Sequence, residues 1–384
     1  MKISSFSSCI NGFLIALLLE RHAIAVISGM GPSFAGLISV ISFLGICALF
    51  MFNIKKPLYK FGYSSFFLSI LAFFIFIYSL ISTVINGEND FGLLFELLAL
   101  LILFFVGKAL NVTAFNCMAI FCIIISTVLS VYLIVDRGYI FSSGVNYLLV
   151  SIPIGTCFLL SLCLSINLNN VILRLLLIVS CIISFTSLFY LQSRAVFLTV
   201  IAFSCFIYFY ISKDSFLSYK NIVLTSILIL FFTYESHTIL NFYENSSLFN
   251  RLNAFFSGNS HEPRSELYSN YFGHLNEFYF SGFGLGGTES GLYTNTVEKY
   301  PHNLILEFWS EFGLLGLIFS ITFTLISIKR SYFLLLNHKD SLIVVVLYLF
   351  FLMNFMKSFS IYQSSVFFLF LGLLFNHELG KGSK

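Results

Sequence analysis

Long apolar runs separated by short polar breaks dominate this chain of 384 residues. A helix needs about 20 mostly apolar residues to cross a bilayer, and about twelve runs approach that length. Only 10% of the residues are charged, whereas soluble domains average about a quarter, so a soluble fold is excluded. The runs lie at residues 6–27, 33–53, 62–85, 91–107, 113–135, 146–167, 171–190, 195–212, 221–239, 303–328, 341–357 and 361–376.

Within these runs the apolar residues follow one another instead of occupying every second position. Alternation would be expected for the strands of an outer-membrane barrel. Helices satisfy their own backbone hydrogen bonds, which the bilayer interior demands. We therefore predict an all-α polytopic membrane protein with about twelve transmembrane helices.

The positive charges predict how the chain is oriented, because cytoplasmic segments are enriched in Lys and Arg. With the N-terminus in the cytoplasm, thirteen of the twenty Lys and Arg residues lie inside and six outside, while Arg21 falls within the first run. Both termini are then cytoplasmic. The one large polar loop, between spans 9 and 10, is then predicted on the far side of the membrane, which in a bacterium is the periplasm. The predicted parts are 1–239 (helices 1–9), 240–302 (periplasmic loop) and 303–384 (helices 10–12 and a cytoplasmic tail).

Charge and cysteine content exclude other classes of protein. The net charge is only +3 and no run of basic residues occurs, so we expect no nucleic-acid partner. All eight cysteines fall within apolar runs, where we interpret them as small apolar fillers and not as disulfides or metal ligands. No cleavable signal is evident, and the first apolar stretch is interpreted as a retained first helix.

The periplasmic loop is the only long polar stretch, and loops of that size usually have a function. After Pro263, apolar residues at helical spacing predict a helix along the membrane surface, with polar residues on its other face. The segment from Phe280 to Gly291 is rich in glycine and is interpreted as a flexible hinge or lid. The apolar face comprises Leu267, Tyr271, Leu275 and Phe278, and the polar face comprises Glu266, Asn270, His274 and Glu277.

Two arginines on the outer side are candidate anion ligands. Runs 171–190 and 195–212 are separated by only four residues that end in Arg194, which predicts a tight helical hairpin with a cation at its tip. Arg194 could instead extend to the lipid headgroups. Arg264 follows Pro263 and could be a solvated surface charge. Because a helix N-terminus disfavours cations, an arginine at this position suggests that an anion holds it.

His302 is the most informative titratable residue. Pro301 suits the first turn of a helix, so His302 and Asn303 are expected to begin the tenth span beside free backbone N–H groups. The positive helix end disfavours an imidazolium, so His302 could act as a neutral base or help a phosphate bind there. The alternative is an ordinary interfacial histidine.

Carboxylates follow His302 on one face of the same predicted helix. Asn303, Glu307 and Glu311 are spaced four residues apart. Carboxylates within a membrane span usually indicate a cavity or a partner, for which Arg194 and Arg264 are candidates. Glu307 could equally belong to a structural ion pair. A further pair, Gly313 and Gly316, is interpreted as allowing close helix contact, and Trp309, the only tryptophan, is interpreted as structural.

The stretch HNLILEFWSEFGLLG, from His302 to Gly316, is His-Asn, nine residues, Gly, two residues and Gly. It resembles the signature of the bacterial O-antigen polymerase and O-antigen ligase superfamily. Gln192 to Leu198 resembles that superfamily's Ser-Arg element, and Arg264, before SGFGLGG, resembles its loop arginine. The resemblance covers roughly the second half of the chain.

This resemblance implies that a glycan is transferred from an undecaprenyl-diphosphate carrier to a sugar hydroxyl, without a metal, nucleotide sugar or other cofactor. Arg194 and Arg264 would bind the diphosphate, which suits the forked geometry of guanidinium groups. His302 would act as the base or orient the acceptor hydroxyl. We also predict substrate contacts for Asn303, Glu307 and Arg251.

We expect an O-antigen polymerase that joins lipid-linked repeat units during lipopolysaccharide biosynthesis. The alternative is the ligase that moves the glycan to lipid A-core. A third hypothesis, a flippase or transporter, would use charges near the middle of the membrane. The available groups, Glu20, Arg21, His22 and Glu96, are scattered, and no internal repeat is evident. The expected partners are the undecaprenyl-diphosphate-linked oligosaccharide, the lipid bilayer and a chain-length regulator.

Overall fold

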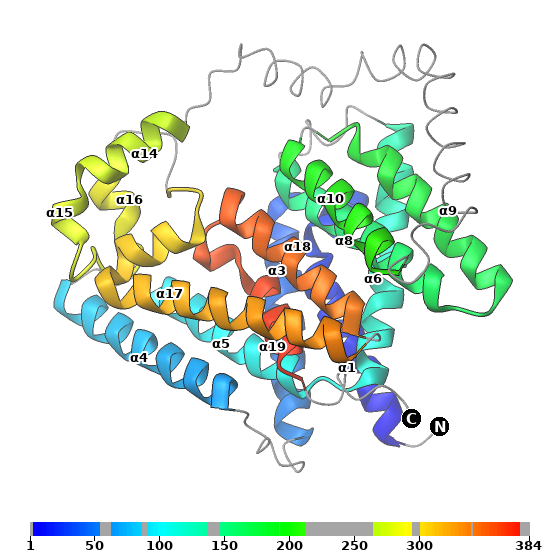
Figure 1. Cartoon of the computed structure of the whole chain (residues 1–384), viewed down its shortest axis with the longest axis horizontal. Helices are drawn as coiled ribbons and strands as arrows, with labels where there is room; N and C mark the ends of the chain where they lie inside the picture. The colour runs from blue at the N-terminus through cyan, green and yellow to red at the C-terminus, as the bar shows by residue number, and fades with distance from the viewer. Residues whose placement is uncertain are drawn as a thin grey trace. The chain divides into compact units, whose positions relative to one another are not determined.

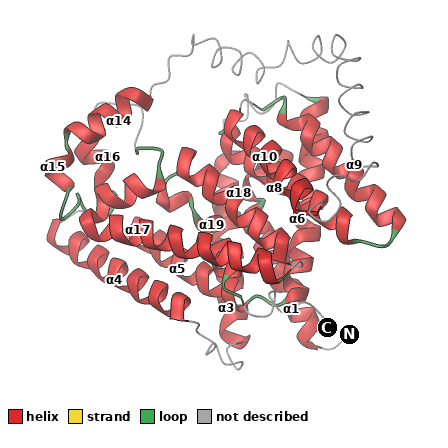
Figure 2. Ribbon diagram, in the orientation of Figure 1, coloured by secondary structure: helices red, strands yellow, loops and turns green. Residues whose placement is uncertain are grey.

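A computed structural model describes residues 3–53, 63–86, 91–136, 146–191, 193–211, 264–293, 300–338 and 341–376. Every regular element in these ranges is helical (Figure 2). The prediction of an all-α polytopic membrane protein is therefore confirmed.

The helices follow the predicted apolar runs closely (Figure 1). Run 221–239 lies outside the described residues, and each of the other runs contains a helix. The elements are α1 Ile3–Leu19, α2 Arg21–Ser28, α3 Gly31–Asn53, α4 Tyr63–Asn86, α5 Phe91–Ala109, α6 Val112–Val135, α8 Tyr147–Asn167, α9 Val171–Leu188, α10 Arg194–Ile211, α14 Arg264–Gly273, α15 Leu275–Phe278, α16 Gly287–Leu292, α17 Leu304–Asn337, α18 Leu342–Ser358, η3 Ile361–Gln363 and α19 Ser365–Leu374.

Within the described residues, seven helices are long and apolar enough to cross a membrane, and eight if the bent pair α1 and α2 forms one span. The two helices of this pair meet at an angle of 70°, where a single first helix was expected. The bend lies at Glu20, which is buried and accepts a hydrogen bond of 2.6 Å from Ser126 of α6. A buried carboxyl group needs such a donor. The total of about twelve crossings stays a prediction.

The chain divides into two compact units. The first comprises Met1–Ile15, Ile41–Cys117 and Glu262–Lys384, and the second comprises Ala16–Val40 and Met118–His261. Arg264, His302, Asn303, Glu307 and Glu311 belong to the first unit, and Arg194 belongs to the second. The division into helices 1–9, a periplasmic loop and helices 10–12 stays a prediction.

In the first unit, α5 and α19 pack with their backbones almost in contact. A Cβ atom added to Gly107 would lie 2.1 Å from the carbonyl oxygen of Leu369, and one added to Gly372 would lie 2.0 Å from that of Phe104. Small residues allow this approach between membrane helices. Helix α4 packs against α17 in the same unit (Figure 1).

In the second unit, α8 is the main packing partner of α9 and also contacts α10. The predicted tight hairpin of α9 and α10 is therefore only partly correct. At their connection the ring of Phe189, the residue after α9, packs against that of Phe197 in α10, with the centroids 4.8 Å apart. Hydroxyl groups join α9 to other helices, as in the 2.6 Å contact between Thr127 and Ser180, because buried hydroxyls need partners. All eight cysteines lie in helices as free thiols.

Candidate functional site

Helix α17 is broken at Gly313, which has a φ of 57° and a ψ of −148°. In a straight helix, Phe308 and Phe323 would be about 22 Å apart. Their ring centroids are instead 6.1 Å apart, so Leu304–Phe312 folds back beside the rest of α17. We call residues 304–312 the half-helix and residues 314–337 the long arm.

This break corrects the prediction of one continuous tenth span over 303–328. Its physical reason is the backbone of Gly313, in a region that is essentially restricted to glycine. Gly316 allows the two arms to approach, because a Cβ atom there would lie 1.9 Å from the carbonyl oxygen of Phe308. The two glycines do permit close contact, but the contact lies within one broken helix and not between separate helices.

Two carboxyl groups of the half-helix are buried and bonded within the protein. Glu307 accepts hydrogen bonds from the hydroxyl of Ser360 and from the backbone N–H of Ile361, the latter at 2.9 Å. Glu311 accepts one from the hydroxyl of Tyr362. Both oxygens of Glu307 are thus engaged by the connection between α18 and α19. This geometry favours a structural role for Glu307 over a substrate contact.

Sequence reasoning missed Ser360 and Tyr362. A signal was available, because residues 358–365 read Ser-Phe-Ser-Ile-Tyr-Gln-Ser-Ser and form a hydroxyl-rich break between two apolar runs. Hydroxyl groups are suitable donors for carboxylates in low-dielectric surroundings. Nothing in the linear order, however, connects this break to a half-helix that lies far earlier in the chain.

The glycine-rich segment, residues 280–291, is fastened to the break in α17. The backbone N–H groups of Phe283 and Gly284 donate to the carbonyl oxygens of Ser310 and Glu311, at 2.8 and 3.0 Å. In the other direction, the N–H of Leu314 donates to the carbonyl oxygen of Phe280 at 3.2 Å. Backbone groups near the break in the helix are therefore satisfied by the segment.

Side chains add to this attachment. Gly286 donates its N–H to the hydroxyl of Tyr362 at 3.0 Å, and the hydroxyls of Thr288 and Ser310 are 2.7 Å apart. The segment was interpreted as a flexible hinge or lid. Because its backbone and side chains bond to α17 and η3, the structure instead makes it a fixed structural element.

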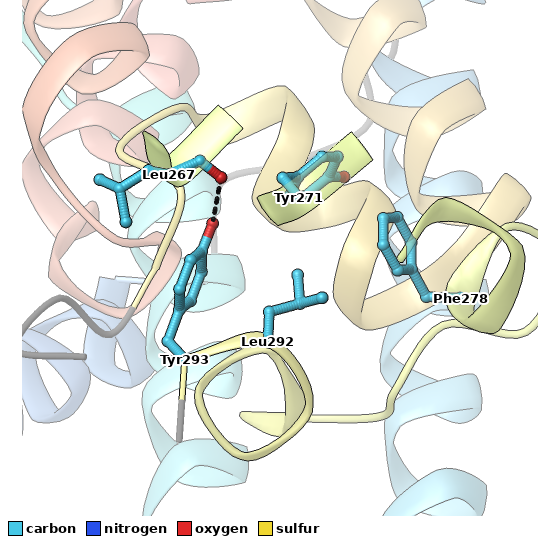
Figure 3. Packing of buried hydrophobic residues seen from close by; sticks show 5 residues of the cluster. All are labelled: Leu267, Tyr271, Phe278, Leu292 and Tyr293. Atoms are coloured by element: carbon cyan, nitrogen blue, oxygen red, sulfur yellow. Dashed lines mark hydrogen bonds between the residues drawn. The ribbon is translucent and has the colours of Figure 1, made fainter. Parts of the chain in front are cut away.

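The predicted surface helix forms as α14 and α15, but its apolar face packs on protein (Figure 3). These residues share one buried cluster with residues at the end of α16, and the hydroxyl of Tyr271 donates to the carbonyl oxygen of Leu306 at 2.7 Å. Burial raises the pKa of the Tyr271 and Tyr293 phenols. The cluster comprises Leu267, Tyr271, Phe278, Leu292 and Tyr293.

His302 and Asn303 lie just before the half-helix. The helix begins at Leu304, so Pro301 is not in its first turn as predicted. The side-chain oxygen of Asn303 accepts hydrogen bonds from the N–H groups of Ile305 and Leu306, at 3.0 and 3.2 Å, and caps the helix. Because this cap needs extended backbone at Asn303, the preceding residues lie outside the helix.

His302, just before the N-terminal end of the half-helix, has an unusual backbone conformation. Its φ is 53°, and it is the only non-glycine residue with a positive φ among those described. L-residues seldom adopt this conformation, although histidine does so more often than most. The His302 ring lies 4.4 Å from that of Tyr300, between centroids.

The three predicted arginines fall in different places. Arg264 is the first residue of α14, the helix that packs against the half-helix through Tyr271. Arg194 is the first residue of α10, in the second unit. Arg251 lies outside the described residues. In the described part of the chain, no three His, Cys, Asp or Glu side chains gather as metal ligands.

The fold and this geometry define a multi-pass helical membrane protein with a broken helix fastened to a glycine-rich loop segment. The family model described as O-antigen ligase matches residues 179–321 of the chain. This match supports placing the chain in the O-antigen polymerase and ligase superfamily, as the motif from His302 to Gly316 indicated. The superfamily implies a glycosyltransferase-type activity in lipopolysaccharide biosynthesis. No curated protein matches the chain.

Proposed function

We propose that this protein is an O-antigen polymerase. It transfers a glycan from an undecaprenyl-diphosphate carrier to a sugar hydroxyl of another lipid-linked repeat unit. It works in the bacterial inner membrane with both termini in the cytoplasm and its site facing the periplasm. A chain-length regulator is the proposed protein partner. The matched region, 179–321, contains all six predicted site residues and supports the superfamily to which both a polymerase and a ligase would belong.

The observation that carries the proposal is the backbone of His302. A left-handed conformation at a non-glycine residue costs on the order of 1 kcal/mol or more and persists only where the surroundings impose it. Here it occurs immediately before the N-terminal end of the half-helix, whose dipole favours anions. Strained residues cluster at functional sites. His302 thus joins an unusual backbone to a titratable side chain at an anion-favouring position.

The proposed reaction breaks the bond between the anomeric carbon of the donor glycan and a phosphate oxygen. The acceptor hydroxyl oxygen forms the new bond to that carbon, and its proton passes to His302 acting as general base. The bonding electron pair leaves with undecaprenyl diphosphate. If His302 only orients the hydroxyl, the proton passes to solvent.

The departing diphosphate gains negative charge, which nearby cations stabilise. We assign that role to Arg194 and Arg264. Guanidinium groups bind phosphate oxygens in pairs and remain charged at any working pH. Asn303 and Arg251 stay predicted substrate contacts, although Asn303 already caps the half-helix. For Glu307, which was also predicted to contact substrate, the bonds to Ser360 and Ile361 favour a structural role.

The second candidate function is the ligase, because the matching family model is described as O-antigen ligase. A ligase would use the same donor and transfer the finished glycan to lipid A-core. The two functions leave different products in a null strain. Core carrying a single repeat indicates a polymerase, whereas bare core with polymer left on the lipid carrier would refute that assignment.

Complementation of the null strain tests the roles of individual residues. Arg194→Ala, Arg264→Ala and His302→Ala are each expected to abolish the glycan ladder on a gel. His302→Asn is the matched variant, because asparagine tolerates a left-handed backbone but provides no base. His302→Gly removes the backbone strain together with the imidazole. A normal ladder from either variant would remove the proposed base.

A further inference from the structure

The turn Tyr279–Gly282 joins α15 to the glycine-rich segment and presents an exposed aromatic side chain. Phe280 is 76% exposed, and Tyr279 beside it is 36% exposed. We propose that this turn is inserted into the bilayer, with the Phe280 ring against lipid acyl chains. The proposal concerns membrane contact and does not depend on the polymerase assignment.

Helix α4 gives the depth of the turn. The hydroxyl of Tyr78 donates to the carbonyl oxygen of Ser281. Tyr78 lies about two thirds of the way along α4, which begins at Tyr63 and ends at Asn86. The whole helix is about 36 Å long, and the hydrocarbon core is about 30 Å thick. A centred α4 therefore places Tyr78, and the turn with it, about 9 Å inside the core.

The long arm of α17 gives an independent estimate of the same depth. The turn contacts its first residue, because Leu314 donates its N–H to Phe280. Lys329 is the first cation of the long arm and is expected at the opposite boundary of the membrane. The helical rise from Leu314 to Lys329 is about 22 Å, which leaves the turn about 8 Å inside a core of about 30 Å. The depths estimated from α4 and from the long arm therefore agree within a few ångströms.

The hydrogen bonds of the turn suit a site without water. Non-helical backbone at membrane depth is tolerated only when its polar groups are satisfied within the protein. The carbonyl oxygen of Phe278 accepts from Gly282 at 2.9 Å, and that of Tyr279 accepts from the indole N–H of Trp309 at 3.3 Å. Those of Phe280 and Ser281 accept from Leu314 and Tyr78. Four consecutive carbonyl groups thus bond within the protein.

Near the turn, α4 and the long arm of α17 also carry exposed apolar side chains. Ile77 and Ile81 flank Tyr78 on α4 and are 36% and 51% exposed, and Ile318, one turn after Leu314, is 50% exposed. Phe280 extends this apolar surface. Glu277, which is exposed in α15, marks the water-facing side, because a carboxylate in hydrocarbon is costly.

The wild-type protein contains its own probe, since Trp309 is the only tryptophan and bonds to Tyr279. We would reconstitute the full-length protein in phosphatidylcholine vesicles whose acyl chains carry bromine at a shallow or a deep position. The shallow bromines are expected to quench Trp309 fluorescence more than the deep ones. Equal fluorescence in brominated and ordinary vesicles would overturn the proposal.

A matched pair of variants locates the turn directly. With Trp309 replaced by Phe, tryptophan is introduced by Phe280→Trp or, as the water-facing control, by Glu277→Trp. Brominated lipid is expected to remove most of the Phe280→Trp emission, whereas aqueous acrylamide quenches chiefly the Glu277→Trp protein. The opposite result, with acrylamide quenching both variants equally, would place the turn in water and refute the proposal. Should Trp309→Phe prevent folding, the wild-type measurement decides alone.

Discussion

Replacing Gly313 with alanine tests whether the break in α17 organises this part of the protein. Gly313 combines a φ of 57° with a ψ of −148°, so the alanine backbone is strained whatever space surrounds it. Space is also absent, because the new Cβ atom would lie 2.1 Å from the carbonyl oxygen of Phe280 and 2.4 Å from its carbon. The half-helix and the glycine-rich segment would have to separate.

The cost follows from these two effects. Backbone strain of this kind costs about 1–3 kcal/mol. Overpacking by the new Cβ atom costs a similar amount, about 1–3 kcal/mol. The free energy of unfolding should therefore fall by about 4 kcal/mol. Unfolding entropy is about 2 cal/mol/K per residue, or about 0.8 kcal/mol/K for a chain of this length, so the melting temperature should fall by about 5 °C.

The assay is thermal unfolding of the detergent-purified protein, followed by the fluorescence of Trp309. Gly273→Ala is the matched control in the same unit, because a Cβ atom there would meet no atom within 4 Å. That variant should melt at or slightly above the wild-type temperature. If Gly313→Ala melts together with Gly273→Ala, the broken helix and its attachment to the segment are refuted.

Three further predictions concern the same region. Tyr362→Phe removes a donor to the buried Glu311 and should cost about 1–3 kcal/mol in unfolding free energy, whereas Tyr332→Phe, at an exposed position, should cost nothing measurable. Asn303→Ala removes the helix cap and should lower the free energy of unfolding by about 1 kcal/mol, while Asn303→Asp keeps the cap. Loss of glycan transfer in Asn303→Asp at unchanged stability would identify Asn303 as a substrate contact. Because burial raises the pKa of the Tyr271 and Tyr293 phenols above the usual value near 10, their contribution to stability should be complete below about pH 10 and lost as the pH rises towards the folded-state pKa. Because the chain has 20 tyrosines, the check is the tyrosinate absorbance at about pH 10 of the folded wild type minus that of folded Tyr271→Phe or Tyr293→Phe. Lower absorbance in either variant would contradict this.

The helices and their order were predictable from the chain alone, because the bilayer demands helices and hydropathy marks where they lie. The helix after Pro263 was predictable from the spacing of Leu267, Tyr271 and Phe278. The surface against which this helix packs was not predictable, since the same apolar face suits a membrane surface or a cluster of protein side chains. Likewise, Glu307 was recognisable as an unusual carboxylate, but its partners come from the distant connection between α18 and α19.

Composition and spacing by themselves determined that this protein is a helical membrane protein. The motif from His302 to Gly316 predicted a resemblance to the O-antigen polymerase and ligase superfamily, which the family match over residues 179–321 supports. Only the tertiary structure decided that Gly313 breaks α17, since glycine permits a sharp turn as well as close helix packing. The choice depends on whether another segment can satisfy the backbone groups exposed by the turn. Here Phe280, Phe283 and Gly284 do so, and such long-range hydrogen bonds leave no periodic pattern in the sequence.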